Sequence, residues 1–205
     1  MTPPMTPKTR YALLALAILA TAGGIYGFRG HESKIEAEAP GGGLKPYATG
    51  ALAAFLVKPK RLPVPDIAFQ DGAGVPLHIG QWQGRVVLLN LWATWCAPCR
   101  KEMPTLAALQ KRLGSKDFEV VAISIDRKGV AASAAFLKET GADGLNLYVE
   151  PSAKILDDLQ ALGLPATVLI DREGKEAGRL LGPAEWASPE AIALIKAALA
   201  EKTPD

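Results

Sequence analysis

Cys96 and Cys99 are the only cysteines in the 205-residue chain, and their spacing suits thiol chemistry. They stand in the sequence Trp-Cys-Ala-Pro-Cys, which follows an apolar run and opens a helical pattern. A cysteine at a helix start has its thiolate stabilised by unpaired N–H groups and by the positive end of the helix dipole. The lowered pKa makes that sulfur nucleophilic at neutral pH. We therefore predict that Cys96 attacks a disulfide and that Cys99, one turn later, resolves the mixed disulfide.

Three other roles for the cysteine pair compete with this one. A structural disulfide across two residues would close too small a loop to stabilise the fold much. A zinc site needs about four ligands, and the chain adds only His31 and His78. Two soft thiolates could hold Cu(I), so a copper-binding assembly factor without redox turnover remains an alternative. We expect a redox couple with no cofactor and no metal.

An apolar segment near the start of the chain, residues 11–28, predicts the cellular compartment. It holds 18 consecutive uncharged residues, which as a helix would measure roughly 27 Å, about the thickness of a hydrocarbon core. Lys8 and Arg10 precede it, and this charge bias would keep residues 1–10 in the cytoplasm. We expect a single-pass inner-membrane anchor, with a cleaved signal peptide as the alternative. Both place the rest of the chain in the periplasm.

Composition predicts one folded domain that does not bind nucleic acid. The chain is 49% hydrophobic and 21% charged with a net charge of +2, which gives no basic footprint for nucleic acid. Residues 29–58 begin polar and glycine-rich, so we expect a linker and an N-terminal extension there; residues 48–57 would form a short helix or a hairpin-like cover. Residues 62–66 must be extended because two prolines disfavour helix. The folded domain is expected over residues 59–205, as a monomer.

Strand and helix patterns alternate along this domain. Short apolar runs typical of buried strands occupy residues 86–91, 120–125 and 166–170, and residues 145–149 look extended. Helical patterns occupy residues 106–113, 131–139, 155–162 and, after a Ser-Pro start, 188–199. Pro104 is expected to interrupt and kink the helix that leads from the cysteines to Leu113. Residues 166–170 and 175–180 flank a turn and should form a hairpin. These elements predict an α/β sandwich around a mixed sheet.

Residues 89–106 resemble the membrane-anchored thioredoxin-like proteins of the TlpA/ResA type. The likeness extends over roughly residues 62–200, and the segments at 163–167 and 182–187 make the TlpA branch the most similar. The resemblance implies a thioredoxin fold with an inserted α–β unit within residues 130–163. It also implies an N-terminal transmembrane helix.

The resemblance implies roles for further residues. Pro165 matches the family's cis-proline, where an ordinary trans turn proline is the alternative, and Leu164 matches the residue whose backbone pairs with the substrate. Trp95 matches a tryptophan beside the cysteines, although it could equally pack in the core. Glu102 matches an acidic residue near the active site, although it could be an exposed helix residue. Because Asn90 stands where cytoplasmic thioredoxins have a buried Asp, Glu102 is our candidate general base.

The residues between and after the cysteines favour a reductant. Ala and Pro provide no charged donor inside the motif, so a thioredoxin-like reducing potential is expected, although Arg100 and Lys101 could lower the pKa of Cys96. We predict a periplasmic reductase of client-protein disulfides that receives electrons from a membrane thiol protein. The resemblance implies clients in cytochrome oxidase copper-site assembly. The alternative client is apocytochrome c during cytochrome c maturation.

One feature of the resembling proteins is missing from this chain. Some relatives of TlpA carry a second, non-catalytic cysteine pair that braces the tether against the domain. Here no cysteine precedes Cys96, and Lys175 stands in the predicted hairpin turn. We therefore expect this brace to be either absent or replaced.

Overall fold

The computed structural model describes residues 43–201. The predicted membrane anchor at residues 11–28 lies outside them. Within residues 43–201, none of the helices combines the length and the apolar character needed to cross a membrane. The described residues belong to a compact unit that spans residues 40–205.

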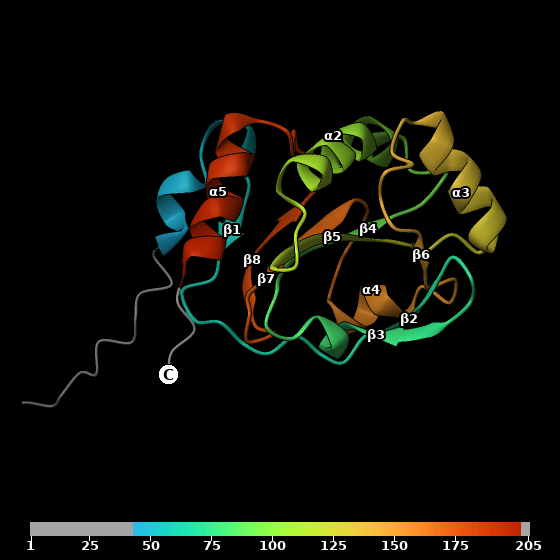
Figure 1. Cartoon of the computed structure of the whole chain (residues 1–205), viewed down its shortest axis with the longest axis horizontal. Coiled ribbons are helices and arrows are strands. Elements are labelled where there is room, and N and C mark those ends of the chain that lie inside the picture. Colours follow the sequence, from blue (N-terminus) through green and yellow to red (C-terminus); the bar gives the residue numbers. More distant parts are fainter. Residues whose placement is uncertain (1–42, 202–205) are drawn as a thin grey trace, which may run out of the picture. The chain divides into compact units, whose positions relative to one another are not determined.

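A mixed sheet forms the centre of this unit (Figure 1). In the described residues it has eight strands, in the order β1-β8-β7-β4-β5-β6-β2-β3. The central strand β4 is parallel to β5 and antiparallel to β7. The strands are β1 (Leu56–Val57), β2 (Ala68–Asp71), β3 (Pro76–His78), β4 (Val86–Trp92), β5 (Phe118–Ser124), β6 (Tyr148–Val149), β7 (Ala166–Ile170) and β8 (Glu176–Leu181).

Helices cover both faces of the sheet. Figure 1 shows α2 above the central strands, α4 below them and α5 on the side of β1 and β8, and α2 packs against β5. The helices are α2 (Ala97–Leu113), α3 (Gly129–Glu139), α4 (Lys154–Asp158) and α5 (Pro189–Ala200), with 3-10 turns η2 (Lys45–Tyr47), η3 (Gly50–Leu52) and η4 (Ile79–Trp82). The arrangement is the predicted thioredoxin fold. Between β5 and β7 lie α3, β6 and α4, so the inserted α–β unit is confirmed.

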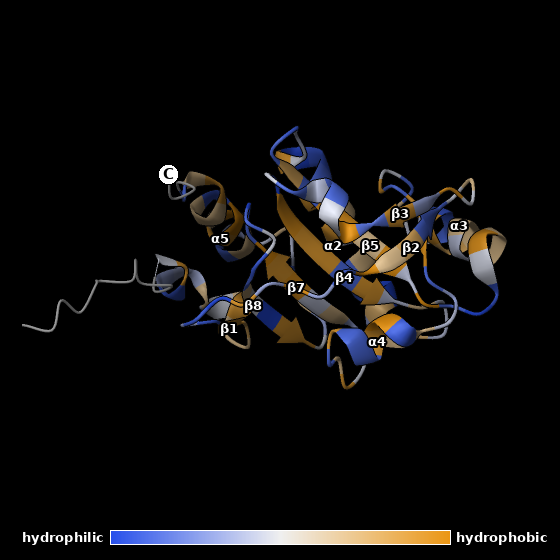
Figure 2. Cartoon of the chain, turned by 90° about the horizontal axis from the view of Figure 1, so that it is seen from below, coloured by the Kyte–Doolittle hydropathy of each residue, from blue (hydrophilic) through white to orange (hydrophobic). Residues whose placement is uncertain are grey.

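The central strands are apolar because they are covered on both faces. Every residue of β4, β5 and β7 is buried, and Figure 2 shows these strands mostly in the hydrophobic colour, while α4 carries much hydrophilic surface. Each fully buried large apolar side chain contributes roughly 1.5–3 kcal/mol relative to exposure. The core therefore keeps the end of β4 rigid, and Cys96 follows shortly after that end.

Helix α4 is shorter than its apolar pattern predicted. It ends at Asp158, and Gln160 adopts a left-handed conformation with φ 53°. The N–H of Ala161 donates to the carbonyl of Leu156, and the N–H of Gln160 donates to that of Asp157, which is a Schellman ending. The predicted extension to Leu162 is therefore wrong, and the Leu162 side chain is 92% exposed.

Two local predictions about chain turns are confirmed. Strands β7 and β8 form an antiparallel hairpin with a register shift after Leu169. The hydroxyl of Ser188 accepts the N–H of Ala191 at 3.1 Å and so caps α5, with Pro189 as the first helical residue. A cap of this kind contributes about 1 kcal/mol to helix stability. The predicted interruption at Pro104 is wrong, because α2 runs as one helix from Ala97 to Leu113.

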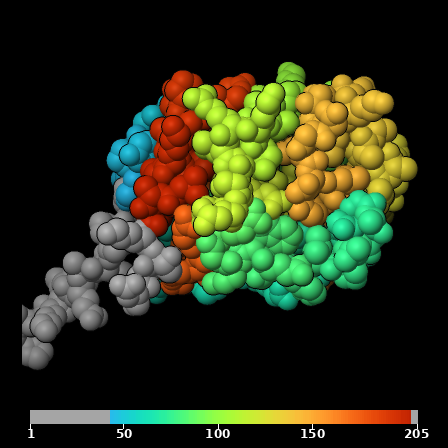
Figure 3. Space-filling model, in the orientation of Figure 1, coloured from blue at the N-terminus to red at the C-terminus, as the bar shows by residue number. Residues whose placement is uncertain are grey.

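The segment before β2 belongs to the same core. Leu44, Leu52 and Phe55 are buried, and η2 and η3 contact α5. Figure 3 shows their blue surface directly beside the red surface of α5. A Cβ atom on Gly178 would lie 2.4 Å from the ring of Phe55, so the glycine makes room for this side chain. Residues 48–57 thus provide η3 and the edge strand β1.

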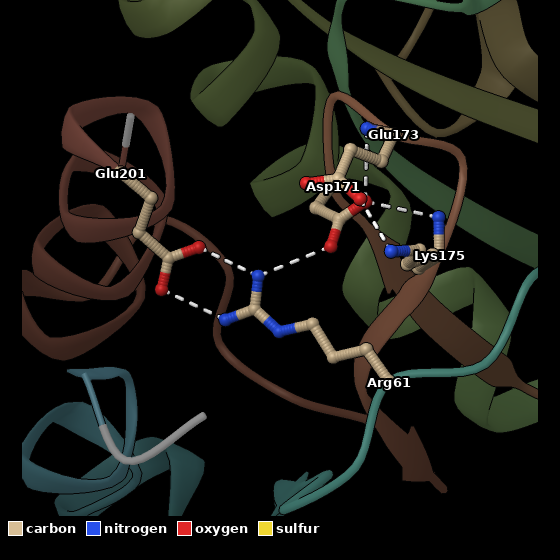
Figure 4. A network of polar contacts seen from close by, with 5 residues as sticks. All are labelled: Arg61, Asp171, Glu173, Lys175 and Glu201. Carbon is tan, nitrogen blue, oxygen red and sulfur yellow. Dashed lines mark hydrogen bonds and ion pairs between the residues drawn. The ribbon is translucent and has the colours of Figure 1, made fainter. Parts of the chain in front are cut away.

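Arg61 joins three distant parts of the chain (Figure 4). Its guanidinium donates to Glu201 at the end of α5 at 2.7 and 2.8 Å and to Asp171 in the β7–β8 turn at 3.1 Å. The other oxygen of Asp171 accepts the N–H groups of Glu173 and Lys175. This network ties the segment before β2 to the β7–β8 turn and to the end of α5. An ion-pair network thus braces these parts of the described chain.

Replacing Arg61 with Met should lower the free energy of unfolding by about 1–2 kcal/mol, because Glu201 loses a bidentate partner and Asp171 loses one donor. Urea unfolding at pH 7 measures this change. Lys154→Met is the matched control, because Lys154 pairs with Asp158 on the exposed surface, where such a pair contributes about 0–0.5 kcal/mol. Equal losses in the two variants would contradict the brace.

Candidate active site

Cys96 and Cys99 lie where β4 passes into α2. They form a disulfide with a Cα–Cα distance of 5.3 Å. Cys96 is the N-cap residue of α2, and its Sγ accepts the N–H of Cys99 at 3.2 Å. Pro98 lies in the first turn of α2, where a backbone N–H has no partner within the helix. Its missing N–H therefore costs the helix no hydrogen bond. The predicted helix-start position is confirmed, and the N–H groups at this end favour a thiolate on Cys96 after reduction.

The two sulfurs differ in access to solvent. Cys96 keeps a small exposed area of 5%, whereas Cys99 is fully buried. This difference suits attack by Cys96 and later resolution by Cys99. The neighbouring Trp95 side chain is 68% exposed, so the alternative in which it packs in the core is wrong.

The peptide bond between Leu164 and Pro165 is cis, as the resemblance implied. Pro165 directly precedes β7, whose first residue Ala166 pairs with Leu91 near the end of β4. The cis-proline therefore lies at the end of the sheet from which the chain runs to Cys96. Neither the N–H nor the carbonyl of Leu164 has a backbone hydrogen-bond partner among residues 43–201.

Glu102 is buried, so the alternative of an exposed helix residue is wrong. Its side chain is only 2% exposed. One carboxylate oxygen accepts Nδ2 of Asn90 at 2.8 Å, and the other accepts the N–H of Ala184 and Nε1 of Trp186, each at 3.3 Å. Burial raises the pKa of Glu102 to about 7, although these hydrogen bonds oppose the shift. The carboxyl can therefore change its protonation state at neutral pH.

Glu102 follows Cys99 by three residues on α2, and both side chains face the interior. Residues at this spacing are neighbours on one side of a helix. Among the described residues, the hydrogen bonds of Glu102 go to β4 and to the loop before α5 rather than to the disulfide. Oδ1 of Asn90 is buried without a hydrogen-bond partner in this part of the chain.

Arg100 is engaged with α3. Its guanidinium lies 4.6 Å from the centre of the Phe136 ring and pairs with Glu139 at 2.9 Å. The ring of Trp92, at the end of β4, stacks with the ring of Phe136, and the two ring centres are 4.9 Å apart. The predicted effect of Arg100 on the pKa of Cys96 is weakened by this neutralising contact.

Some contacts of Glu102 were not predicted from the sequence. Trp186 and Ala184 lie in a segment singled out only for its resemblance, and Thr167 accepts a hydrogen bond from Asn90 at 3.0 Å. The available signal was a polar residue within an otherwise apolar strand, because buried polar groups need partners. Asn90 and Thr167 are such residues in β4 and β7, which are adjacent.

The chain is similar to proteins named for thiol–disulfide chemistry. It is 32% identical over 111 residues to the thiol-disulfide oxidoreductase ResA of Bacillus subtilis, covering 54% of this chain and 61% of the relative. It is 34% identical over 101 residues to the thiol:disulfide interchange protein HelX of Rhodobacter capsulatus, covering 49% of this chain and 54% of the relative. The matches thus span less than two thirds of these two relatives.

A crystal structure from Chlorobium tepidum, provisionally named thiol:disulfide interchange protein DsbE, has the same fold. It superposes with a TM-score of 0.61 at 29% identity and covers 68% of this chain and 97% of that one. The family model named Redoxin matches residues 60–195, which include both cysteines, Glu102 and Pro165. The chain therefore belongs to the Redoxin family.

Proposed function

We propose that the protein is a thiol–disulfide oxidoreductase that reduces disulfides of client proteins. The observation that carries the proposal is the Cys96–Cys99 disulfide at the N-terminus of α2, with Cys96 as the N-cap. Sequence relatives named as thiol–disulfide oxidoreductases support it. So does the chemistry of the site, since a cysteine at a helix start forms a reactive thiolate.

The reaction begins with the reduced pair. The Cys96 thiolate attacks one sulfur of the client disulfide, forms a Cys96–client bond and releases the other client sulfur as a thiolate, which takes a proton. Cys99 then loses its proton and attacks Sγ of Cys96, so that the second client sulfur leaves. Two electrons pass from the protein to the client, and the Cys96–Cys99 disulfide remains.

Glu102 is the proposed acceptor of the Cys99 proton. Its pKa of about 7 leaves a substantial ionised fraction at neutral pH, and the burial of both groups on one helix excludes most of the water that could compete. The donors from Asn90 and Trp186 hold the carboxylate in place. A base whose pKa lies near the working pH is the most effective one for this step.

Client binding is proposed to involve Trp95, Leu164 and Pro165. Trp95 offers a large exposed aromatic surface next to Cys96. The free backbone groups of Leu164 can pair with an extended client segment in the manner of an added strand. Leu164 and Pro165 directly precede β7 and lie at the end of the sheet near the cysteines.

The cellular role is proposed from the sequence. An anchor at residues 11–28 would hold residues 59–205 in the periplasm, and a membrane thiol protein would return two electrons to the disulfide. Clients in cytochrome oxidase copper-site assembly are favoured by the segments at 163–167 and 182–187, which resemble the TlpA branch. Reduction of apocytochrome c is the second candidate, favoured by the similarity to ResA.

A redox titration of the full chain against glutathione tests the proposed function. We expect the cysteine pair to equilibrate with a potential near that of thioredoxin, about −270 mV. A potential as high as about −120 mV would indicate an oxidant rather than a reductant. A pair that binds Cu(I) but does not exchange with glutathione would instead support the copper-binding alternative and overturn the oxidoreductase.

A further inference from the structure

Asp126 connects the loop after β5 to the turn before Cys96. Its side chain is 2% exposed. Oδ2 accepts the backbone N–H of Thr94 at 3.2 Å and also the hydroxyl of Thr94, while Oδ1 accepts the N–H of Lys128 at 2.9 Å. Burial favours the neutral carboxyl, but the hydrogen bonds from Thr94 and Lys128 outweigh it and lower the pKa of Asp126. The group is therefore a carboxylate at neutral pH.

The residue that Asp126 holds lies within the turn that presents Cys96. The N–H of Cys96 donates to the carbonyl of Ala93 at 3.1 Å, so Thr94 and Trp95 are the two central residues of this turn. The N–H of Ile125 donates to the carbonyl of Trp92 at 2.9 Å, which continues the pairing of β4 with β5 beyond their ends. Asp126 directly follows Ile125, so this added pairing brings Asp126 beside Thr94.

Charged groups of both signs lie on the segments next to Cys96, and most of them are paired with other residues or exposed to solvent. Arg100 is paired with Glu139, and Glu102 accepts three hydrogen bonds in the interior. Arg127 and Lys128 are exposed, so their effect is reduced by solvent screening. The buried negative charge tied directly to the Cys96 turn belongs to Asp126. Lys101, the remaining charged group beside the cysteines on α2, is exposed as well.

We propose that Asp126 is a positioning residue for thiol exchange: through Thr94 it holds the turn that presents Cys96, and its negative charge biases the cysteine pair toward the disulfide. A fixed negative charge near Cys96 makes the thiolate less favourable. Because that thiolate stabilises the reduced form, disfavouring it makes the reduced protein a stronger electron donor. The inference rests on the proposed function and adds a reason why the pair acts as a reductant.

Two variants of the full chain separate the charge from the holding role. Asp126→Asn removes the charge at nearly constant shape and replaces one of the two accepting oxygens by a donating amide, whereas Thr94→Val removes the hydroxyl bond and keeps the charge. For Asp126→Asn we expect the thiolate fraction of Cys96 below its pKa to rise about three- to tenfold. The equilibrium with glutathione should shift by a similar factor toward the dithiol. Thr94→Val should show no such shift but should react more slowly with a small aromatic disulfide.

The readouts are the pH dependence of Cys96 alkylation by iodoacetamide, the glutathione equilibrium and the rate with dithiobis-nitrobenzoate. Thr94→Ser is the matched control, because it keeps the hydroxyl and should restore the wild-type rate. The charge role would be overturned if the pKa of Cys96 stayed the same or rose in Asp126→Asn. It would also be overturned if Thr94→Val lowered the pKa of Cys96 as much as Asp126→Asn does. A wild-type rate in Thr94→Val would overturn the holding role.

Two further measurements keep the test decisive. If Asp126→Asn does not fold, Asp126→Ser removes the same charge, and thermal unfolding shows which variants retain the native state. The alkylation measurement uses the reduced protein alone. A wild-type chain that never equilibrates with glutathione would therefore refute the proposed function, while the pKa of Cys96 would still decide the role of Asp126.

Discussion

A Cys99→Ser variant of the full chain is expected to accumulate a covalent complex with a disulfide-containing protein such as insulin. Cys96 is the sulfur with exposed surface, and Cys99 is buried behind it. Without the resolving thiol, the Cys96–client bond persists because no second sulfur can displace the client. Reduction of insulin should fall by more than about a thousandfold, as is usual when a covalent catalytic group is removed. Non-reducing electrophoresis and mass spectrometry measure the complex.

Cys96→Ser is the matched variant, because it removes the attacking sulfur and leaves Cys99. We expect no covalent complex from it and a loss of turnover at least as large, since the remaining thiol is fully buried. Addition of dithiothreitol should release the client from the Cys99→Ser complex. A complex that formed equally well through Cys99 would reverse the roles assigned to the two sulfurs.

The central sheet was predictable from sequence because its physical cause is local. Strands covered on both faces must be apolar along their whole length, and the runs near 86–91, 120–125 and 166–170 correspond to β4, β5 and β7. The helix start at Cys96 and the cap at Ser188 were equally local, since each depends on one side chain and the next turn.

Helix α4 shows where the local pattern fails. Leu162 continues the apolar spacing of residues 155–159, yet the left-handed Gln160 ends the helix before it. Nothing in the pattern distinguishes a buried leucine from an exposed one near the cis-proline. The tertiary arrangement decides, because the chain must turn to enter β7 beside β4.

The candidate site was predictable in its sulfurs but not in its polar surroundings. Resemblance pointed to Glu102, whereas its partners Asn90 and Trp186 come from β4 and the loop before α5, and Asn90 in turn donates to Thr167 of β7. The contact between Asp126 and Thr94 likewise joins positions 32 residues apart. Such long-range pairs depend on strand order and register, which the spacing of residues in one sequence does not specify.

Glu102→Gln is expected to slow the reduction of insulin about a hundredfold at neutral pH, because the Cys99 proton loses its acceptor. The wild-type single-turnover rate should rise with pH through about 7, where Glu102 becomes ionised. The variant should lack this rise and show only the titration of the thiols. Glu185→Gln, which alters an exposed carboxylate in the same region, is the control. An unchanged pH profile in Glu102→Gln would exclude Glu102 as the base.

The same carboxyl should make stability depend on pH in a defined direction. Burial raises the pKa of Glu102 from 4.5 to about 7, so between these values the folded state binds the proton more tightly than the unfolded chain. This contribution is complete below pH 4.5 and is lost as the pH rises through 7. The wild-type free energy of unfolding should therefore fall relative to Glu102→Gln by about 3 kcal/mol between pH 4 and pH 8. Urea unfolding of both proteins at these two pH values measures the difference, and parallel pH dependences would show that Glu102 keeps an ordinary pKa.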